Sequence, residues 1–205
     1  MERIQEVDIN NPEEYKRIWE ERMNKDIDVF DMKRWKLLLK YFHGGKLIDL
    51  GCLDSEVPLM AKKKFPKAEI WALDFVKEVI DSYKEVYPEI MYVVGDVYKT
   101  TFPSNYFDYV VLGEVIEHLE RPTDAIYEAF RILKKGGILA LSTPLEEIKE
   151  LGAKDKDRHL WSFNKEDIEE MLGVYGTVKI KIMKSQYLPI YKYNFPNIIA
   201  YGRKS

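Results

Sequence analysis

The sequence lacks the features that mark secreted and membrane proteins. Cys52 is the single cysteine among 205 residues, which excludes an internal disulfide and fits a reducing compartment. There is no run of about 18 apolar residues, so we expect no membrane-spanning helix. The first residues also lack the basic-then-apolar order of a secretion signal. These absences together predict a cytoplasmic protein.

An excess of positive charge is also missing. The chain has 32 Lys and Arg against 35 Asp and Glu, a net charge of −3. Proteins that bind nucleic acid usually carry a basic excess that neutralises phosphates, so nucleic acid is not an expected partner. A small molecule is expected instead. The composition leaves the oligomeric state open, including a homodimer.

Apolar residues are plentiful, and their spacing alternates along the chain between that of helices and that of strands. This alternation is typical of a parallel sheet flanked by helices. We therefore expect an α/β fold with a doubly wound, seven-stranded, mostly parallel sheet. The last strand is expected to be antiparallel because no helix separates it from the one before. The predicted strands are 46–50, 68–74, 91–94, 109–112, 138–141, 178–183 and 197–203.

The same reading predicts a single domain over residues 1–205 with three parts. Residues 1–45 form an N-terminal helical cap, because Asn11-Pro12 is a helix start and Gly44-Gly45 a helix end. Residues 46–145 form the ligand-binding core. Residues 146–205 supply a substrate-side segment and the terminal strands.

Glycines and acids follow the predicted strands. In an open parallel sheet, ligands bind outside the carboxyl ends of the strands. Acids at several strand ends indicate a ligand rich in hydroxyl and amino donors. The loop after the first strand, 51–56, has one glycine and two acids and lacks the G-x-G-x-x-G pattern, which disfavours a dinucleotide. The strand-end residues are Asp49, Gly51, Cys52, Asp74, Gly95, Asp96, Gly113 and Glu114.

At this point the sequence resembles the class I S-adenosylmethionine-dependent methyltransferases, in particular the small stand-alone enzymes of ubiquinone and menaquinone biosynthesis. The resemblance covers residues 46–145 closely and the remainder by element order. The segments that carry it are LIDLGC at 47–52, IWALD at 70–74, VVGDV at 93–97, FDYVVLGEVIEHLERP at 107–122 and ILKKGGILALSTP at 132–144.

The resemblance implies that S-adenosylmethionine binds across these strand ends. Asp74 would hold the ribose hydroxyls, Phe75 would pack beside the adenine and Asp96 would accept the adenine amino group. Gly113 and Glu114 would form the floor of the site beneath the sulfonium. The full set implied to bind the cofactor is Asp49, Gly51, Cys52, Asp74, Phe75, Asp96, Val97, Gly113 and Glu114.

The first predicted helix offers a lid over this site. Tyr15, Trp19 and Arg22 are candidates for contacts with the cofactor. Packing of the two aromatic side chains in the core is the alternative.

Two positions depart from the family pattern. Relatives usually carry a second glycine where this chain has Leu53, and often a third where it has Ser55. The departure leaves open a catalytically silent module that binds the cofactor or a partner.

The string Glu114 to His118 supplies the candidate catalysts. A sulfonium already activates the methyl group, so the protein need only align a nucleophile for direct in-line transfer and remove a proton. His118 is the candidate general base and Glu114 its neighbour on a helical turn; a structural hydrogen bond is the alternative for His118. We assign no metal ligand. Glu114, Glu117, His118 and His159 nevertheless resemble the metal site of small-RNA 2′-O-methyltransferases, so metal-assisted 2′-O-methyl transfer is a further alternative.

Overall fold

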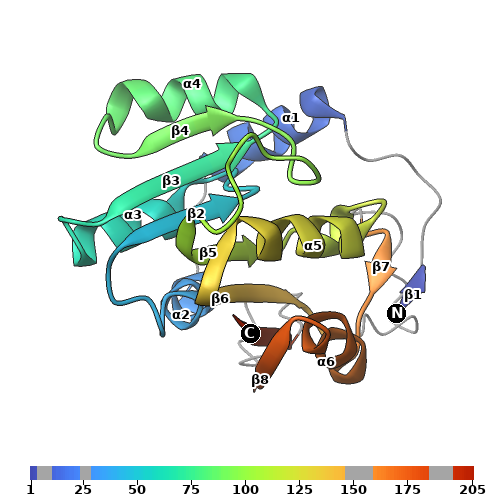
Figure 1. The fold of residues 1–205 in the computed structure, drawn as a ribbon. Helices are drawn as coiled ribbons and strands as arrows, with labels where there is room; N and C mark the ends of the chain where they lie inside the picture. The colour runs from blue at the N-terminus through green and yellow to red at the C-terminus, as the bar shows by residue number, and fades with distance from the viewer. Residues whose placement is uncertain (4–10, 24–28, 146–158, 185–195) are drawn as a thin grey trace.

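The computed structural model describes residues 1–3, 11–23, 29–145, 159–184 and 196–205, and does not describe the side chains of Arg22 and Met23. It has a central sheet with helices on both faces (Figure 1). Among the described residues, no helix combines the length and apolar character needed to cross a bilayer. In chain order the elements are β1 (Glu2–Arg3), α1 (Pro12–Met23), α2 (Val29–Leu38), β2 (Lys46–Leu50), α3 (Glu56–Lys64), β3 (Glu69–Asp74), α4 (Lys77–Val86), β4 (Met91–Val94), β5 (Phe107–Gly113), η1 (Ile116–His118), α5 (Pro122–Ile132), β6 (Leu133–Pro144), β7 (Trp161–Ser162), α6 (Lys165–Gly173), β8 (Gly176–Met183) and β9 (Asn197–Lys204).

The main sheet has seven strands in the order β4-β3-β2-β5-β6-β9-β8. Strands β2 to β6 pair in parallel, and β9 runs antiparallel to both of its neighbours. The prediction of a doubly wound sheet with an antiparallel last strand is therefore confirmed. The chain proceeds from β2 outward through β3 and β4, then returns to β5 on the other side. This reversal lies between β2 and β5, where ligands bind in such folds.

Successive residues of the buried strands feed two separate cores. In β2, Leu47 belongs to the cluster that packs under α2, α3 and α4. Its neighbour Ile48 belongs to the cluster under α5 and α6. Because side chains alternate across a strand and both faces are covered, Leu47, Ile48 and Leu50 are all apolar, and the buried Asp49 is the exception.

The structure extends several predicted strands by one to three residues, among them β5, β8 and β9, and differs more at three places. Strand β6 covers Leu133–Pro144 rather than 138–141, because Leu133 pairs with Phe107 of β5 and β9 pairs with β6 from Ile138 through Pro144. A two-stranded sheet joins β1 to β7, which no apolar pattern predicts in strands of two residues. The short turn η1 is a 3-10 helix.

The division of the chain into three parts stays a prediction. Residues 146–158 and 185–195, which make up much of the predicted substrate-side segment, lie outside the described residues. Within the described part, α1 lies beside the carboxyl ends of the central strands (Figure 1). The ring of Tyr15 on α1 is 5.2 Å from the ring of Phe75, which follows β3.

Candidate functional site

The loop after β2 turns sharply beneath β3. The amides of Gly51 and Cys52 both donate to the carbonyl of Leu73, at 2.8 and 3.1 Å. Gly51 has a φ of +80°, and a Cβ atom there would lie 2.7 Å from Cγ2 of Val115. Only glycine fits both the left-handed backbone and this close approach. The first predicted glycine is thus required by the turn itself.

The two departures from the family pattern keep the shape of this loop. Ser55 has a φ of 54°, the left-handed conformation that a glycine adopts without strain. The Leu53 side chain is half-buried and packs against the core cluster under α2, α3 and α4. Ser55 therefore adopts a glycine-like backbone without a glycine, whereas Leu53 keeps a backbone with negative φ.

Asp74 closes β3 and joins three loops. Its Oδ2 accepts the amide of Leu53 at 3.0 Å, and its Oδ1 accepts the amide of Val76 at 3.0 Å. The Asp74 carbonyl accepts the amide of Gly95, which follows β4. Burial raises the pKa of the Asp74 carboxyl, and the backbone amides oppose this rise. Asp74 is therefore the point where the segments after β2, β3 and β4 meet.

Negative charge gathers around Asp74. Asp49, at 5% exposure, is buried in β2, and burial together with the charges of Asp54 and Asp74 raises its pKa well above the usual range. Burial also raises the pKa of the neighbouring Cys52 thiol, which disfavours the thiolate that a nucleophilic role would need. A cationic or hydrogen-donating ligand would relieve the carboxylates.

The loop after β4 contributes Asp96 and Val97. The Asp96 side chain is exposed, and its Oδ1 accepts the amide of Tyr98 at 2.8 Å. Val97 is half-buried and packs against the core under α5. The Gly95 amide places this loop beside Asp74, as predicted from the topology, and the adenine-binding role of Asp96 and Val97 stays a prediction.

Helix α1 brings Tyr15 over the strand ends. The centroid of its ring lies 5.2 Å from that of Phe75, which follows β3, and 6.1 Å from that of His118, which follows β5. Burial, with the charges of Glu117 and Asp74, raises the pKa of the Tyr15 hydroxyl. Trp19, one turn on, donates to the hydroxyl of Tyr83 on α4 at 3.4 Å. Tyr15 therefore spans the candidate site, while Trp19 anchors the helix.

Glu114 is held by groups distant in the sequence. It has a φ of 55°, and its carboxylate accepts Oγ of Ser142 at 2.7 Å and both bonds from Nδ2 of Asn197 at 3.1 and 3.0 Å. The buried Arg34 lies 3.3 Å from the same carboxylate. Gly113 precedes it, and a Cβ there would lie 3.0 Å from Cδ1 of Leu38. This environment fixes Glu114 in one position, and the sequence showed no signal for Arg34 or Asn197.

The turn η1 places Glu117 and His118 beside His159. The two imidazole rings are 4.7 Å apart. Glu117 is 1% exposed, and Thr143 donates to its Oε2 at 3.1 Å. Burial, reinforced by the charge of Glu114, raises the pKa of Glu117 to about 8. Of the four residues considered as a metal set, three converge and Glu114 does not join them.

Comparison with known proteins agrees with this geometry. Residues 48–141 match the methyltransferase domain family. The chain is 31% identical over 103 residues to a demethylmenaquinone methyltransferase of Chlamydia muridarum, covering 48% of this chain and 45% of that protein. It is 24% identical over 121 residues to a ubiquinone/menaquinone biosynthesis C-methyltransferase of Desulfotalea psychrophila, covering 56% and 49%. The chain thus spans about half the length of these curated relatives.

A solved structure supports the fold. The crystal structure of an S-adenosylmethionine-dependent methyltransferase from Archaeoglobus fulgidus superposes with a TM-score of 0.68 at 15% identity, covering 93% of this chain and all of that one. The strand order, the Gly51 turn and the matched segment 48–141 lead to one assignment. Over residues 48–141 the chain is similar to the methyltransferase domain family, and its fold is shared with a solved S-adenosylmethionine-dependent methyltransferase.

Proposed function

We propose that this protein transfers a methyl group from S-adenosylmethionine to a small molecule by direct in-line displacement. The observation that carries the proposal is the position of Asp74, where the loops after β2, β3 and β4 meet. A carboxylate oxygen has two lone pairs, so each Asp74 oxygen can accept a ribose hydroxyl besides its backbone amide.

Charge favours this cofactor over a dinucleotide. Burial raises the pKa of Asp49, and the charges of the nearby Asp54 and Asp74 raise it further. An amino group and ribose hydroxyls would supply donors to these carboxylates, whereas a pyrophosphate would be repelled. S-adenosylmethionine, when bound, supplies a methyl group already activated by its sulfonium.

The chain's own residues would orient and deprotonate the acceptor. His118 is the candidate general base, because its half-buried ring follows β5 at the reversal of the sheet. Glu114 has its carboxylate engaged by Ser142 and Asn197, which suits a positioning role better than proton transfer. The two predicted catalytic residues thus take different roles: His118 removes the proton and Glu114 positions its surroundings.

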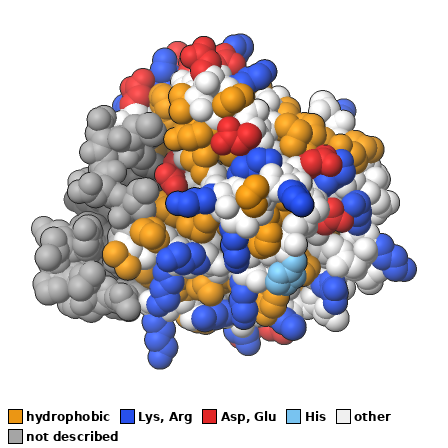
Figure 2. All heavy atoms as spheres, turned by 90° about the vertical axis from the view of Figure 1, so that its left-hand side faces the viewer, with side chains coloured by type: hydrophobic (Ala, Val, Ile, Leu, Met, Phe, Trp, Pro, Cys, Tyr) orange, Lys and Arg blue, Asp and Glu red, His pale blue; other side chains and the backbone are white. Residues whose placement is uncertain are grey.

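The acidic groups near the candidate site support a small acceptor. Figure 2 shows Lys and Arg side chains spread over the face at the amino ends of the strands, interspersed with acidic and apolar groups. The candidate site lies at the opposite, carboxyl ends. A nucleic-acid substrate would need its phosphates neutralised near the reacting group, and the charge near Asp49 and Asp74 is negative.

Isothermal titration with S-adenosylhomocysteine tests the cofactor, and a radiolabelled methyl-transfer screen over small-molecule extracts tests the activity. We expect saturable binding and label incorporated into an extractable compound. His118→Ala should then reduce turnover far more than cofactor affinity, with His43→Ala as the exposed control. Absence of binding would reject the cofactor. Binding without any transfer would support the catalytically silent module instead.

A further inference from the structure

Glu117, His118 and His159 form a compact cluster of potential metal ligands. One ligand atom from each residue lies within 4.8 Å of the others. Glu117 and His118 come from η1, and His159 comes from the segment just before β7, 41 residues along the chain from His118. Such convergence of one carboxylate and two imidazoles from separate segments is the donor arrangement of many divalent metal sites.

The backbone holds the two segments together. The amide of Leu160 donates to the carbonyl of Glu117 at 2.7 Å. The indole of Trp161 donates to the carbonyl of Leu119 at 2.7 Å. The two acceptors flank His118 in the sequence and both donors directly follow His159, so these bonds hold His159 beside η1. Ligands on a pre-formed scaffold bind a metal without a further cost of ordering.

One carboxylate oxygen of the cluster has no hydrogen-bond partner among the described residues. Glu117 is 1% exposed, and its Oε2 accepts the Thr143 hydroxyl. Its Oε1 is buried and has no hydrogen-bond partner among the described residues. A buried acceptor without a partner costs about 1–3 kcal/mol, and more when it carries charge. A cation bound at this cluster would supply the missing partner.

Glu114 stays outside the cluster because Ser142, Asn197 and Arg34 occupy its carboxylate. The donor set is therefore three residues and not the four that the sequence pattern suggests. Two imidazoles disfavour Mg²⁺ and Ca²⁺, which prefer oxygen ligands, and favour transition metals and zinc.

We propose that Glu117, His118 and His159 bind one divalent ion of the kind that imidazole ligands favour, Zn²⁺ in the first place, beside the methyl-transfer site. Three protein ligands leave coordination positions open, which is the arrangement of catalytic metal sites. An oxygen of the methyl acceptor is the ligand that these positions would take. A metal-bound His118 could not also act as the general base, so the metal would replace it in that role by lowering the pKa of the bound hydroxyl. Only this last role rests on the proposed function; metal binding itself does not.

Titration of the EDTA-treated protein with ZnCl₂, MnCl₂ and MgCl₂ tests the site. We expect one Zn²⁺ per chain, weaker binding of Mn²⁺ and no competition from Mg²⁺. Glu117→Gln and His159→Ala should each weaken binding by about 100-fold or more. His43→Ala, which removes the one histidine outside the cluster, should bind as the native protein does. Failure to bind Zn²⁺ and Mn²⁺, or binding that His159→Ala leaves unchanged, would overturn the proposal.

Thermal unfolding keeps the test independent of folding defects. Without metal, Glu117→Gln should be about as stable as the native protein, because an amide of the same shape replaces a buried carboxyl whose Oε1 has no hydrogen-bond partner among the described residues. Zn²⁺ should raise the Tm of the native protein and not that of the variant. An equal rise in both would contradict the site.

The same samples separate this proposal from the proposed function. Titration with S-adenosylhomocysteine reports the cofactor site alone. Metal binding without cofactor binding would reject the proposed function and keep the metal site. Cofactor binding without metal binding would reject the metal site and keep the proposed cofactor.

Discussion

The amide of Leu53 donates to Oδ2 of Asp74 at 3.0 Å, which ties the loop after β2 to the end of β3. The residue that departs most from the family pattern is therefore engaged, through its backbone, with the residue expected to hold the ribose. The Leu53 side chain packs against the core cluster that α2, α3 and α4 cover. The backbone of Leu53 thus supports Asp74, and its side chain contributes to core packing.

Asp74→Asn should weaken S-adenosylhomocysteine binding by about 10- to 100-fold. Hydrogen bonds to a charged acceptor are worth about 1.5–3 kcal/mol, and an amide nitrogen would face an amide donor in place of one carboxylate oxygen. Isothermal titration measures the change. Asp81→Asn, on the exposed side of α4 where it pairs with Lys77, is the matched control and should bind normally. An unchanged Kd in Asp74→Asn would remove Asp74 from the site.

Leu53→Ala should lower the free energy of unfolding by about 1–2 kcal/mol and leave cofactor affinity within about twofold. The cost is below that of a fully buried leucine because this side chain is only half-buried. Urea unfolding gives the first quantity and calorimetry the second. If Leu53→Gly instead tightened cofactor binding about tenfold or more, the side chain would be an obstruction.

Tyr15→Ala should weaken cofactor binding by about tenfold, whereas Tyr15→Phe should stay within about twofold. The ring packs edge-on against Phe75 and lies near His118, and aromatic pairs contribute about 0.5–1.5 kcal/mol beyond area burial. The two variants separate the ring from the hydroxyl. Stronger binding to Tyr15→Ala would mean that Tyr15 competes with the cofactor for its position.

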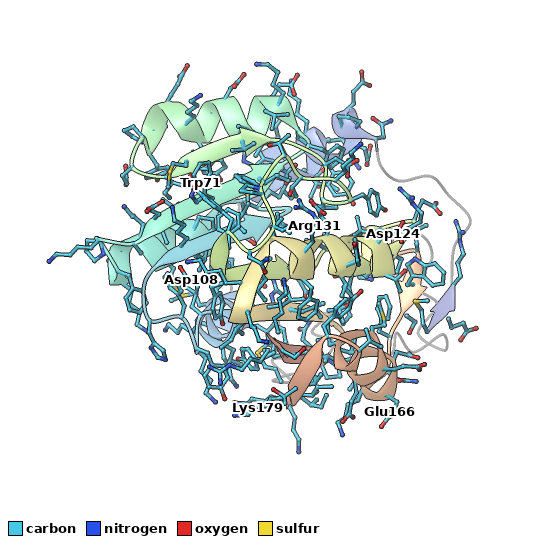
Figure 3. All side chains as sticks on the ribbon, viewed as in Figure 1. Trp71, Asp108, Asp124, Arg131, Glu166 and Lys179 are labelled. Atoms are coloured by element: carbon cyan, nitrogen blue, oxygen red, sulfur yellow. The ribbon has the colours of Figure 1, made fainter. Side chains whose placement is uncertain are left out.

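Glu128→Gln should destabilise the fold by about 2 kcal/mol at pH 7 and much less below about pH 4. Glu128 is buried, which opposes ionisation, but hydrogen bonds from Arg131 and Thr100 leave its pKa lowered overall. Arg131 lies on α5 near the loop between β4 and β5 (Figure 3) and also donates to the carbonyl of Phe102 in that loop.

The direction of the pH dependence of stability follows from the lowered pKa of Glu128. A carboxyl that ionises more readily when folded contributes stability above its unfolded pKa, and this contribution is lost as the pH falls through the folded pKa. Urea unfolding from pH 3 to 7 should show the two proteins converging at the acid end. Glu69→Gln, whose exposed carboxylate pairs with Lys46, should change stability by less than about 0.5 kcal/mol throughout. A difference for Glu128→Gln that does not vary with pH would contradict the assignment.

The strands and their order were predictable because buried parallel strands are short, apolar and separated by helices. That topology in turn required Asp49, Asp74 and Glu114 to lie at one edge of the sheet. The partners of Glu114 were not predictable, because Arg34 and Asn197 come from α2 and β9 and show no local pattern. The position of Tyr15 depends on how α1 packs across the strand ends, which helical periodicity alone does not determine.

Strand β9 follows β8 in the chain but lies between β8 and β6. During synthesis on the ribosome, β8 emerges with no neighbour to pair with, and β6 has an open edge until β9 arrives. The antiparallel end of the sheet must therefore assemble in one step after β9 has left the exit tunnel, and the open edge of β6 is where a nascent chain would be exposed to aggregation.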